Sequence, residues 1–327
     1  MTAEPRCSVV SLAYRRPKQW SVVTMTNVRS AFDEFLQHLE LTEVEQDTAS
    51  RQQNDLRARI RDELGGVDRD VLVGSYARGT AIRPLNDIDV FLVLDPSVHS
   101  ARHHKEPTHI LDRLRTALQA CYPPPGPRIR IRIQGRSVNI EFSRTEIGYD
   151  IIPAFSLTPD GTNVEGMIYE IPDRDRQSWI KTNPERHRQE CVSANARAGG
   201  MLNRLIKAAK YWNSAQCDAN GDKPVRSFHL EVMAYEAFAT KPTDERRGLW
   251  SLFGFLATRI TSRCSDPARL GPNVDAGMTP DERQRIQLKL QKAERIASEA
   301  VRQEHLGNHV AACNNWRSLF GPKFPLS

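Results

Sequence analysis

Hydrophobic residues recur every three or four positions in the first part of the chain and again through its second half. This spacing predicts one helix over residues 26–64, which the pair Gly65-Gly66 ends, and another over residues 107–120. The apolar positions that carry the first helix are Phe32, Phe35, Leu36, Leu39, Leu56, Ile60 and Leu64.

Short apolar runs and one alternating run predict the β-strands. Residues 70–73 and 87–94 are short apolar runs on either side of a Gly-Ser turn. The segment RIRIRIQ alternates strictly, so its isoleucines share one face of a strand and its arginines share the other. The segments SVNIEF and EIGYDIIPAF follow as two further strands, and we expect Pro153 to end the last one.

After Phe155 the pattern becomes mostly helical. Breakers such as DANGDKP and SDPARLGPNV separate the predicted helices. These helices cover residues 184–214, 226–240, 245–262, 280–304 and 307–319.

The plan is therefore an α+β fold with two parts. Residues 26–183 form an α/β part, a mixed β-sheet with flanking helices, and residues 184–327 form a helical lobe. Residues 1–25 show no clear period, and we interpret them as a disordered tail or as an extension upstream of the true start. The first helix should pack across both parts, and the cleft between the parts is the expected site.

Composition narrows the class of protein. The chain has 327 residues, of which 39% are hydrophobic and 26% charged. No apolar run approaches the roughly 20 residues that a membrane span needs, and no signal peptide is recognised. Six cysteines lie without CxxC spacing, which argues against a zinc site or disulfide framework and fits the cytoplasm. A net charge of +6 suits polyanionic ligands such as nucleotides but is common among soluble proteins.

The candidate chemistry begins with two carboxylates at the start of a strand. Asp87 and Asp89 are two positions apart, so their side chains project from the same face. Neighbouring carboxylates repel one another unless a cation lies between them. Mg²⁺ suits such a pair, because it prefers oxygen ligands and shares them with substrate phosphates.

The turn before this strand supplies hydrogen-bond donors for a phosphate. Gly74 allows close approach of the backbone, and the Ser75 hydroxyl and nearby N–H groups can donate to phosphate oxygens. The segment YARGT should form a short helix whose N-terminus faces the same anion. A lone DxD or a lone Gly-Ser is usually a solvated pair or a simple turn. Their order on strand, turn, helix and strand favours a nucleotide site.

This arrangement resembles a known superfamily. The pattern G-S-x-x-x-G-T followed by D-x-D is similar to the signature of the polymerase-β-like nucleotidyltransferases, which need a third carboxylate on a nearby strand. Asp150, Glu141 and Glu146 are candidates. The phrase DIIPAF resembles the D-x-x-P-A segment of the cGAS/DncV-like branch, the CD-NTases, which favours Asp150. Members of that branch are bacterial cyclic-oligonucleotide synthases of anti-phage (CBASS) signalling.

The helical part extends the resemblance. RLIKAAKYWN and SFHLE resemble two helices of that branch, which form its OAS-like helical lobe. The resemblance implies that Lys210 and Ser227 hold the terminal phosphates of the donor nucleotide. The alternatives are that Lys210 is a solvated helix lysine and that Ser227 is a helix N-cap, a role compatible with phosphate binding. We interpret His229 as structural.

The resemblance also implies a mechanism and its cofactors. Asp87 and Asp89 would ligate two Mg²⁺ ions, with Mn²⁺ as a substitute, and Asp150 would ligate the one that activates the acceptor hydroxyl. Gly74, Ser75, Lys210 and Ser227 would fix the triphosphate. NTPs such as ATP and GTP would be joined into a cyclic di- or trinucleotide with release of pyrophosphate. Some members need a regulatory activator protein; no membrane or obligate nucleic acid is expected.

Two other functions remain open from the sequence. A tRNA CCA-adding enzyme shares the core motif, but this chain looks short for tRNA-binding domains. A catalytically silent module would bind a nucleotide or an RNA end through Arg128, Arg130 and Arg132. We expect this arginine strip to be a solvated outer face. Base choice, ring size and linkage cannot be predicted from the sequence.

Overall fold

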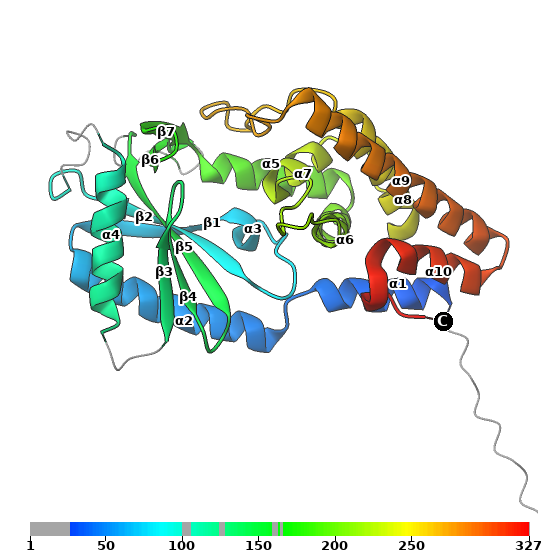
Figure 1. Cartoon of the computed structure of the whole chain (residues 1–327), viewed down its shortest axis with the longest axis horizontal. Helices are drawn as coiled ribbons and strands as arrows, with labels where there is room; N and C mark the ends of the chain where they lie inside the picture. Colours follow the sequence, from blue (N-terminus) through cyan, green and yellow to red (C-terminus); the bar gives the residue numbers. More distant parts are fainter. Residues whose placement is uncertain (1–26, 100–105, 124–127, 159–162, 164–165, 327) are drawn as a thin grey trace, which may run out of the picture.

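The computed structural model of the chain describes residues 27–99, 106–123, 128–158, 163 and 166–326. Figure 1 shows the β-sheet in one half of the molecule and helices α6–α10 in the other. The helices are α1 (Val28–Leu39), α2 (Glu43–Leu64), α3 (Gly74–Ala77), α4 (Thr108–Cys121), α5 (Pro184–Arg197), α6 (Leu202–Ala215), α7 (Ser227–Ala234), α8 (Glu245–Arg259), α9 (Pro280–His305) and α10 (His309–Phe320). The strands are β1 (Val67–Val73), β2 (Asp87–Leu94), β3 (Ile129–Ile133), β4 (Val138–Phe142), β5 (Ile147–Ser156), β6 (Tyr169–Asp173) and β7 (Ser178–Thr182).

The sheet is mixed, as expected. Its main order is β1-β2-β5-β4-β3, and β5 continues into a pair with β6, which pairs with β7. Only β2 and β5 run parallel among these pairings. Apolar residues of β2, β4 and β5 pack on one face against α2 and α4. The opposite face of β2 and β5 therefore carries the other alternating set, which includes Asp87, Asp89 and Asp150.

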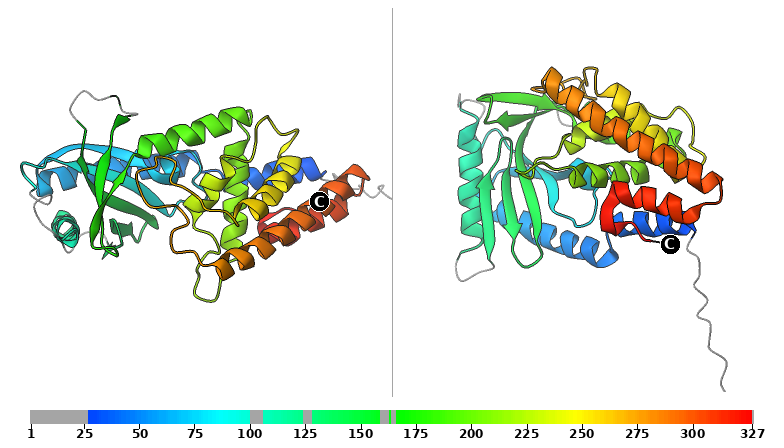
Figure 2. Two further views of the ribbon diagram at one scale, coloured as in Figure 1. Left: turned by 90° about the horizontal axis from the view of Figure 1, so that it is seen from above. Right: turned by 45° about the vertical axis from the view of Figure 1, so that its right-hand side comes forward.

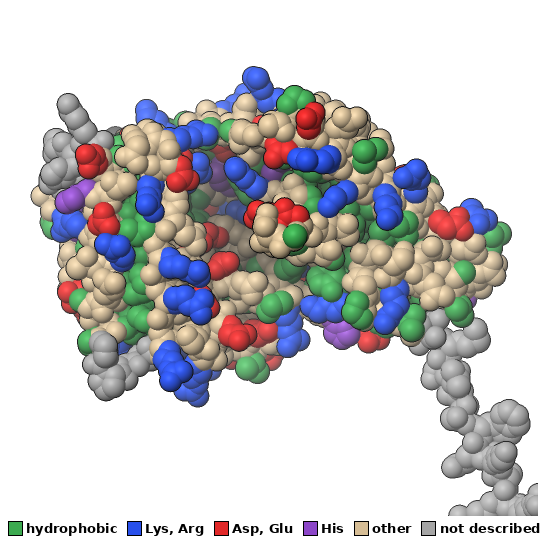
Figure 3. All heavy atoms as spheres, viewed as in Figure 1, with side chains coloured by type: hydrophobic (Ala, Val, Ile, Leu, Met, Phe, Trp, Pro, Cys, Tyr) green, Lys and Arg blue, Asp and Glu red, His purple; other side chains and the backbone are tan. Residues whose placement is uncertain are grey.

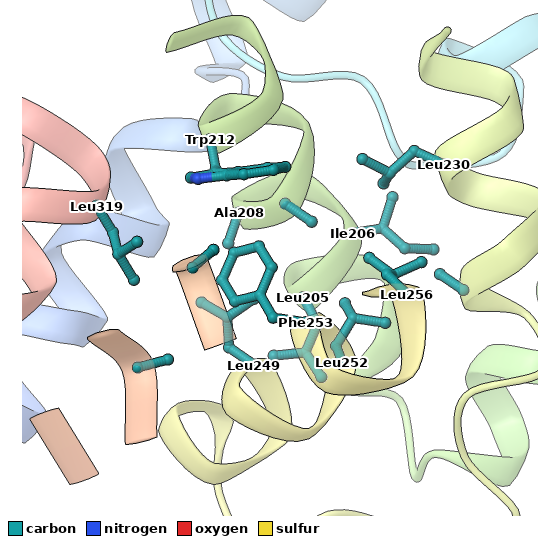
Figure 4. Packing of buried hydrophobic residues seen from close by; sticks show 14 of the residues in the cluster. Leu205, Ile206, Ala208, Trp212, Leu230, Leu249, Leu252, Phe253, Leu256 and Leu319 are labelled. Carbon is teal, nitrogen blue, oxygen red and sulfur yellow. The ribbon is translucent and has the colours of Figure 1, made fainter. Parts of the chain in front are cut away.

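The helical part has its own apolar core, which includes the first helix. Buried residues of α1 pack with those of α6, α8, α9 and α10. Figure 4 shows Trp212 of α6 above Phe253 of α8, with leucines of both helices around them. The two rings meet edge to face with their centroids 5.2 Å apart. Such aromatic pairs stabilise a fold by more than the area they bury would predict.

The predicted helix over residues 26–64 is two helices, which is a correction. α1 ends at Leu39 and α2 begins at Glu43. Thr42 and Glu45 form a reciprocal capping box, which satisfies backbone N–H groups that would otherwise lack partners at the start of α2. The break lets α1 join the helical core while α2 lies along the sheet, as the two views in Figure 2 also show.

Other boundaries also differ from the prediction. Pro153 does not end β5, which continues to Ser156; its missing N–H is tolerated because β4 pairs with β5 only as far as Ile151. The hairpin β6–β7 was not predicted from the mostly helical pattern after Phe155. The predicted helix 184–214 is two helices separated by Gly199 and Gly200, which both have positive φ.

Two further expectations concern the ends and the membrane. The interpretation of residues 1–25 lies outside the described residues. Among the described residues, none of the helices has the length and apolar character required to cross a bilayer.

Candidate active site

A cleft of about 520 Å³ lies between the sheet and the helical part. Figure 3 shows the surface hollowed between the two halves, with acidic side chains in the hollow and basic side chains around it. The predicted site residues that line the cleft are Gly74, Ser75, Asp87, Asp89, Lys210 and Ser227.

The strand register brings the three aspartates together. Asp89 of β2 pairs directly with Asp150 of β5, and Asp87 pairs with Gly148. Directly paired residues share a face of the sheet, so Asp87, Asp89 and Asp150 all project from the face that meets the cleft. We call these three residues the aspartate triad.

Glycines on the neighbouring backbone make room for the carboxylates. A Cβ atom on Gly74 would lie 1.7 Å from Oδ2 of Asp89, and φ at Gly74 is +69°. A Cβ atom on Gly148 would lie 2.6 Å from Oδ1 of Asp87. A side chain at either position would displace a carboxylate, so both glycines are needed for close approach, and Gly74 is needed for its backbone conformation as well.

The carboxylates of the triad lack enough positive charge around them. Burial, followed by the charge of Asp150, raises the pKa of Asp89 to about 6. Burial also raises the pKa of Asp87, although Lys223 acts in the opposite direction. Burial raises the pKa of Asp150, against hydrogen bonds from Asn139 and Ser137. A divalent cation would supply the missing charge.

Asp150 is oriented by β4. Its Oδ1 accepts hydrogen bonds from Nδ2 of Asn139 at 3.0 Å and from Oγ of Ser137 at 3.4 Å. With the side chains in this orientation, no trio of His, Cys, Asp or Glu among the described residues is gathered closely enough to hold a metal ion. The donor set nevertheless fits Mg²⁺, because it consists of carboxylates on one face around a crowded, partly buried centre.

The rival third carboxylates lie elsewhere. Glu141 shares the same face two strands away, but it pairs with Arg132 at 3.2 Å and with Arg130 at 3.5 Å. Glu146 is exposed in the turn between β4 and β5 with φ of +58°. Asp150 is therefore the candidate that lies beside Asp89.

The arginine strip does not lie on an isolated outer face. Arg130 and Arg132 are on the same face of the sheet as the aspartate triad, and Glu141 neutralises part of their charge. Their side chains remain 62% and 59% exposed. They form a solvated basic border next to the site.

The Gly-Ser turn forms a single helical turn. α3 begins at Gly74 itself, two residues earlier than the predicted YARGT helix, and it ends at Ala77, so it includes only the first two residues of that segment. The carbonyl of Ser75 accepts backbone hydrogen bonds from Thr80 and Ala81. These bonds fix the backbone of Ser75, which lines the same cleft as Asp89.

Lys210 is buried, so the solvated-lysine alternative is wrong. Its ammonium group donates to Oε1 of Glu231 and to the carbonyl of Thr80, both at 2.9 Å. Burial lowers its pKa, although Glu231 opposes that effect. Lys210 still lines the cleft, and it links α6 to the segment that follows the Gly-Ser turn.

Ser227 is the first residue of α7, and the N-cap position belongs to Arg226. The N-cap alternative is therefore wrong as well. Among the described residues, no hydrogen bond to the Ser227 hydroxyl is formed, and the residue lines the cleft. Asn213 fixes the preceding segment by exchanging hydrogen bonds of 2.7 and 3.2 Å with the backbone of Val225.

His229 is consistent with a structural role. It is 1% exposed, and burial lowers its pKa to about 4. At neutral pH this buried histidine of α7 is therefore uncharged.

The sequence analysis assigned no role to four residues of the cleft. Arg78 and Glu231 form an ion pair at 3.0 Å across the two parts. Phe228 lies under the Arg78 guanidinium, at 5.0 Å. Lys223 lines the cleft near Asp87. Arg78 lies within the motif GSYARGT and Glu231 within SFHLE, but nothing in the local sequence indicates that these two residues would meet.

The fold and site can now be compared with known proteins. Residues 25–195 match the Second Messenger Oligonucleotide or Dinucleotide Synthetase domain family. A cyclic AMP-AMP-AMP synthase of Acinetobacter sp. is 26% identical over 274 residues, which cover 78% of this chain and 72% of that protein. A cyclic AMP-AMP-GMP synthase of Enterobacter hormaechei is 24% identical over 360 residues, which cover 90% of this chain and 91% of that protein.

Solved structures share the fold. The CdnC:HORMA-deltaN complex of Escherichia coli MS115-1 superposes with a TM-score of 0.69 at 20% identity, covering 92% of this chain and 99% of that chain. Vibrio cholerae DncV, a cyclic AMP-GMP synthase solved with a linear intermediate, gives a TM-score of 0.71 at 16% identity, with 90% and 97% covered.

The fold and the family match together define a nucleotidyltransferase. The chain belongs to the Second Messenger Oligonucleotide or Dinucleotide Synthetase domain family, within the cGAS/DncV-like CD-NTases. The predicted superfamily, branch and fold are confirmed. The comparisons favour the synthase over the tRNA enzyme and the silent module.

Proposed function

We propose that this enzyme joins NTPs into a cyclic di- or trinucleotide in the cleft, with release of pyrophosphate, and that the product serves anti-phage signalling in the cytoplasm. The observation that carries the proposal is the register of Asp89 against Asp150 beside the Gly74–Ser75 turn. Curated relatives of similar length are cyclic trinucleotide synthases, which supports a cyclic product.

Each site residue has a defined task in this proposal. Gly74 and Ser75 bind the triphosphate through backbone N–H groups and a hydroxyl, and Ser227 adds a second hydroxyl from α7. Lys210 contributes positive charge near the terminal phosphates. Asp150 accepts the proton of the attacking ribose hydroxyl.

The aspartate triad would hold the metal ions. Two bound Mg²⁺ ions would supply charge neutralisation on the phosphates and would increase the acidity of the attacking hydroxyl. Asp87 and Asp89 lie nearest the cleft and would contact both ions, and Asp150 would contact the one beside the acceptor. Mn²⁺, with similar oxygen preference, would substitute.

Substrate and partner assignments rest on the relatives. CdnC of E. coli MS115-1 was solved with ATP, and CdnG of Bradyrhizobium diazoefficiens with GTP. We propose ATP as the first substrate to test and GTP as the second. The complex of CdnC with a HORMA protein makes a regulatory partner a reasonable addition to the assay.

The test is incubation of the purified protein with ATP, GTP, CTP and UTP and with Mg²⁺ or Mn²⁺, followed by mass spectrometry of phosphatase-treated products. A cyclic, phosphatase-resistant product is expected. Activity that appears only when tRNA is added would instead support CCA addition. Nucleotide binding without any product, with or without candidate activators, would support the silent module.

The double variant Asp87→Ala/Asp89→Ala tests the metal assignment. It should fold, because both side chains lie at the cleft end of β2 rather than in the apolar core, and it should release no pyrophosphate. Turnover equal to that of the unmodified enzyme would contradict the metal assignment.

A further inference from the structure

Arg78 is a positively charged residue of the cleft that has no task in the proposed function. It follows α3, and its backbone is fixed at both ends. Its N–H donates to the carbonyl of Gly74 at 3.2 Å, and its own carbonyl accepts from Nδ2 of Asn203 at 3.3 Å. Its side chain is 8% exposed and lines the cleft.

Two neighbours orient the guanidinium group. Nε donates to Oε2 of Glu231 at 3.0 Å, and the group lies over the ring of Phe228 at 5.0 Å. The flat guanidinium suits both contacts at once, whereas a lysine ammonium could not reproduce them. Glu231 is 1% exposed and also accepts from Thr80 and Lys210, so it is held firmly itself.

The terminal nitrogens of Arg78 have no hydrogen-bond acceptor within the part of the chain that the structure describes. Among the described residues, neither Nη1 nor Nη2 donates a hydrogen bond; the only side-chain donor of Arg78 in use is Nε. These two nitrogens carry four of the five guanidinium N–H groups. Arg78 is also close enough to Asp89 to lower the pKa of that carboxyl. Arg78 is therefore a buried cation that lies over the Phe228 ring and near Asp89, and its two terminal nitrogens make no hydrogen bond with the described residues.

We propose that Arg78 binds a phosphate group of the incoming nucleotide through its two terminal nitrogens, and that Glu231 and Phe228 hold its side chain in that orientation. This inference deepens the proposed function of the same cleft. A phosphate presents paired oxygens that match the fork, and charge-assisted, bidentate hydrogen bonds of this kind are among the stronger polar contacts in proteins.

The test compares Arg78→Lys with the unmodified enzyme. Lysine keeps the positive charge but loses the fork. The readouts are kcat/KM for NTP turnover and the affinity for α,β-methylene-ATP measured by calorimetry in Mg²⁺. The analogue cannot be turned over, because carbon replaces the oxygen that joins its α- and β-phosphates. We expect both kcat/KM and affinity to fall by about 10- to 100-fold in a protein that still unfolds cooperatively.

Arg69→Lys is the matched control. Arg69 lies on β1 and is stacked on Tyr169 at 5.8 Å, with Nη2 donating to the hydroxyl of that tyrosine at 3.2 Å. It is therefore an arginine over an aromatic ring that does not line the catalytic cleft. Arg69→Lys should leave turnover and affinity for the analogue unchanged.

The outcomes separate this inference from the proposed function. Arg78→Lys that binds the analogue within twofold of the unmodified enzyme overturns the role of Arg78, whether or not the enzyme makes a cyclic product. An unmodified enzyme that does not bind the analogue contradicts both proposals. If Arg78→Lys does not unfold cooperatively, Arg78→Ala is assayed with added guanidinium ion; recovery of binding supports the inference, and no recovery overturns it.

Discussion

Two groups of charged residues lie at the cleft, and they are built in opposite ways. The aspartate triad carries like charges, and the pKa of each member is raised by burial. The second group, which we call the buried ion cluster, consists of Arg78, Lys210 and Glu231. Its carboxylate accepts from Arg78, Thr80 and Lys210, and the two cations hold the pKa of Glu231 low although burial alone would raise it.

The difference indicates which group awaits a ligand and which one supports the fold. In the proposed function the triad holds metal ions, and these cations would relieve the repulsion among its carboxylates. The buried ion cluster is complete around Glu231 but has more positive than negative charge in total. It can therefore connect the sheet to the helical part and still attract phosphates into the cleft.

The largest expected effect comes from Asp89→Asn, which removes one charge of the triad and keeps its shape. We expect pyrophosphate release from NTPs to fall by about 10³-fold or more, because a metal ligand supplies several kcal/mol of transition-state stabilisation. The unfolding temperature of the metal-free protein at pH 7 should rise, since repulsion with Asp150 is removed. Pyrophosphate assays and thermal scans measure the two effects.

Asp112→Asn is the control for that prediction. Asp112 is an exposed residue of α4, paired with Arg115 at 3.1 Å. Its substitution should change neither turnover nor stability appreciably. A drop in the unfolding temperature of Asp89→Asn would contradict the view that the triad is destabilising without metal.

Glu231→Gln in the buried ion cluster should lower the stability of the protein, whereas Asp89→Asn should raise it. Loss of the carboxylate charge leaves Arg78 and Lys210 buried without a counterion, which typically costs about 3–5 kcal/mol. Denaturant unfolding should show this loss, and the KM for ATP should rise because the two cations are no longer held in place. A stability equal to that of the unmodified protein would show that the cluster is not a structural link.

Glu299→Gln is the matched control for the buried cluster. Glu299 lies on α9 and pairs with Arg302 at 2.7 Å, with both side chains largely in solvent. Solvent screens such pairs strongly, so denaturant unfolding and the KM for ATP should be nearly unchanged.

Gly74→Ala tests whether the glycine serves the triad or only the turn. The added methyl group would overlap the Asp89 carboxylate, and a displacement of about 1 Å at a reacting centre can lower the rate by about 100-fold. Gly307→Ala is the control, because Gly307 has a similar φ of +79° and no atom within 4 Å of the added Cβ. Equal loss of turnover in both variants would mean that backbone conformation alone matters.

The smallest effect concerns pH. The pKa of Asp89 is raised from 3.8 to about 6 in the folded, metal-free protein, so the folded state binds more protons than the unfolded state between these values. The contribution of Asp89 to stability therefore falls as pH rises through this window. Asp89→Asn should gain about 1–3 kcal/mol over the unmodified protein at pH 7 and almost nothing near pH 3.5. A gain independent of pH, seen in thermal scans without metal, would contradict this.

Much of the sheet could be predicted because its residues are patterned locally. The strand 87–94 was predicted with the bounds it has, and the alternation of RIRIRIQ placed β3 correctly. The hairpin β6–β7 was missed because its apolar runs are only a few residues long and a polar turn lies between them. Its pairing with β5 depends on contacts that are distant in sequence.

The site residues also divide into those that local sequence predicts and those that depend on distant contacts. Asp87, Asp89 and the Gly74–Ser75 turn lie close together in sequence, so their chemistry could be inferred from spacing. Asp150 needed a family resemblance, because nothing local distinguishes it from Glu141 or Glu146. Lys210 was recognised in the same way, but its burial against Glu231 was not expected.

The sequence by itself determined the order of elements, the same-face pair of carboxylates and the glycine that precedes them, because period-2 alternation and turn chemistry act over a few residues. Only the tertiary structure decided that Asp150 stands beside Asp89 and that Arg78 meets Glu231. These residues are 61 and 153 positions apart along the chain. Their meeting depends on strand register and on the packing of the two parts, which the apolar cores set together.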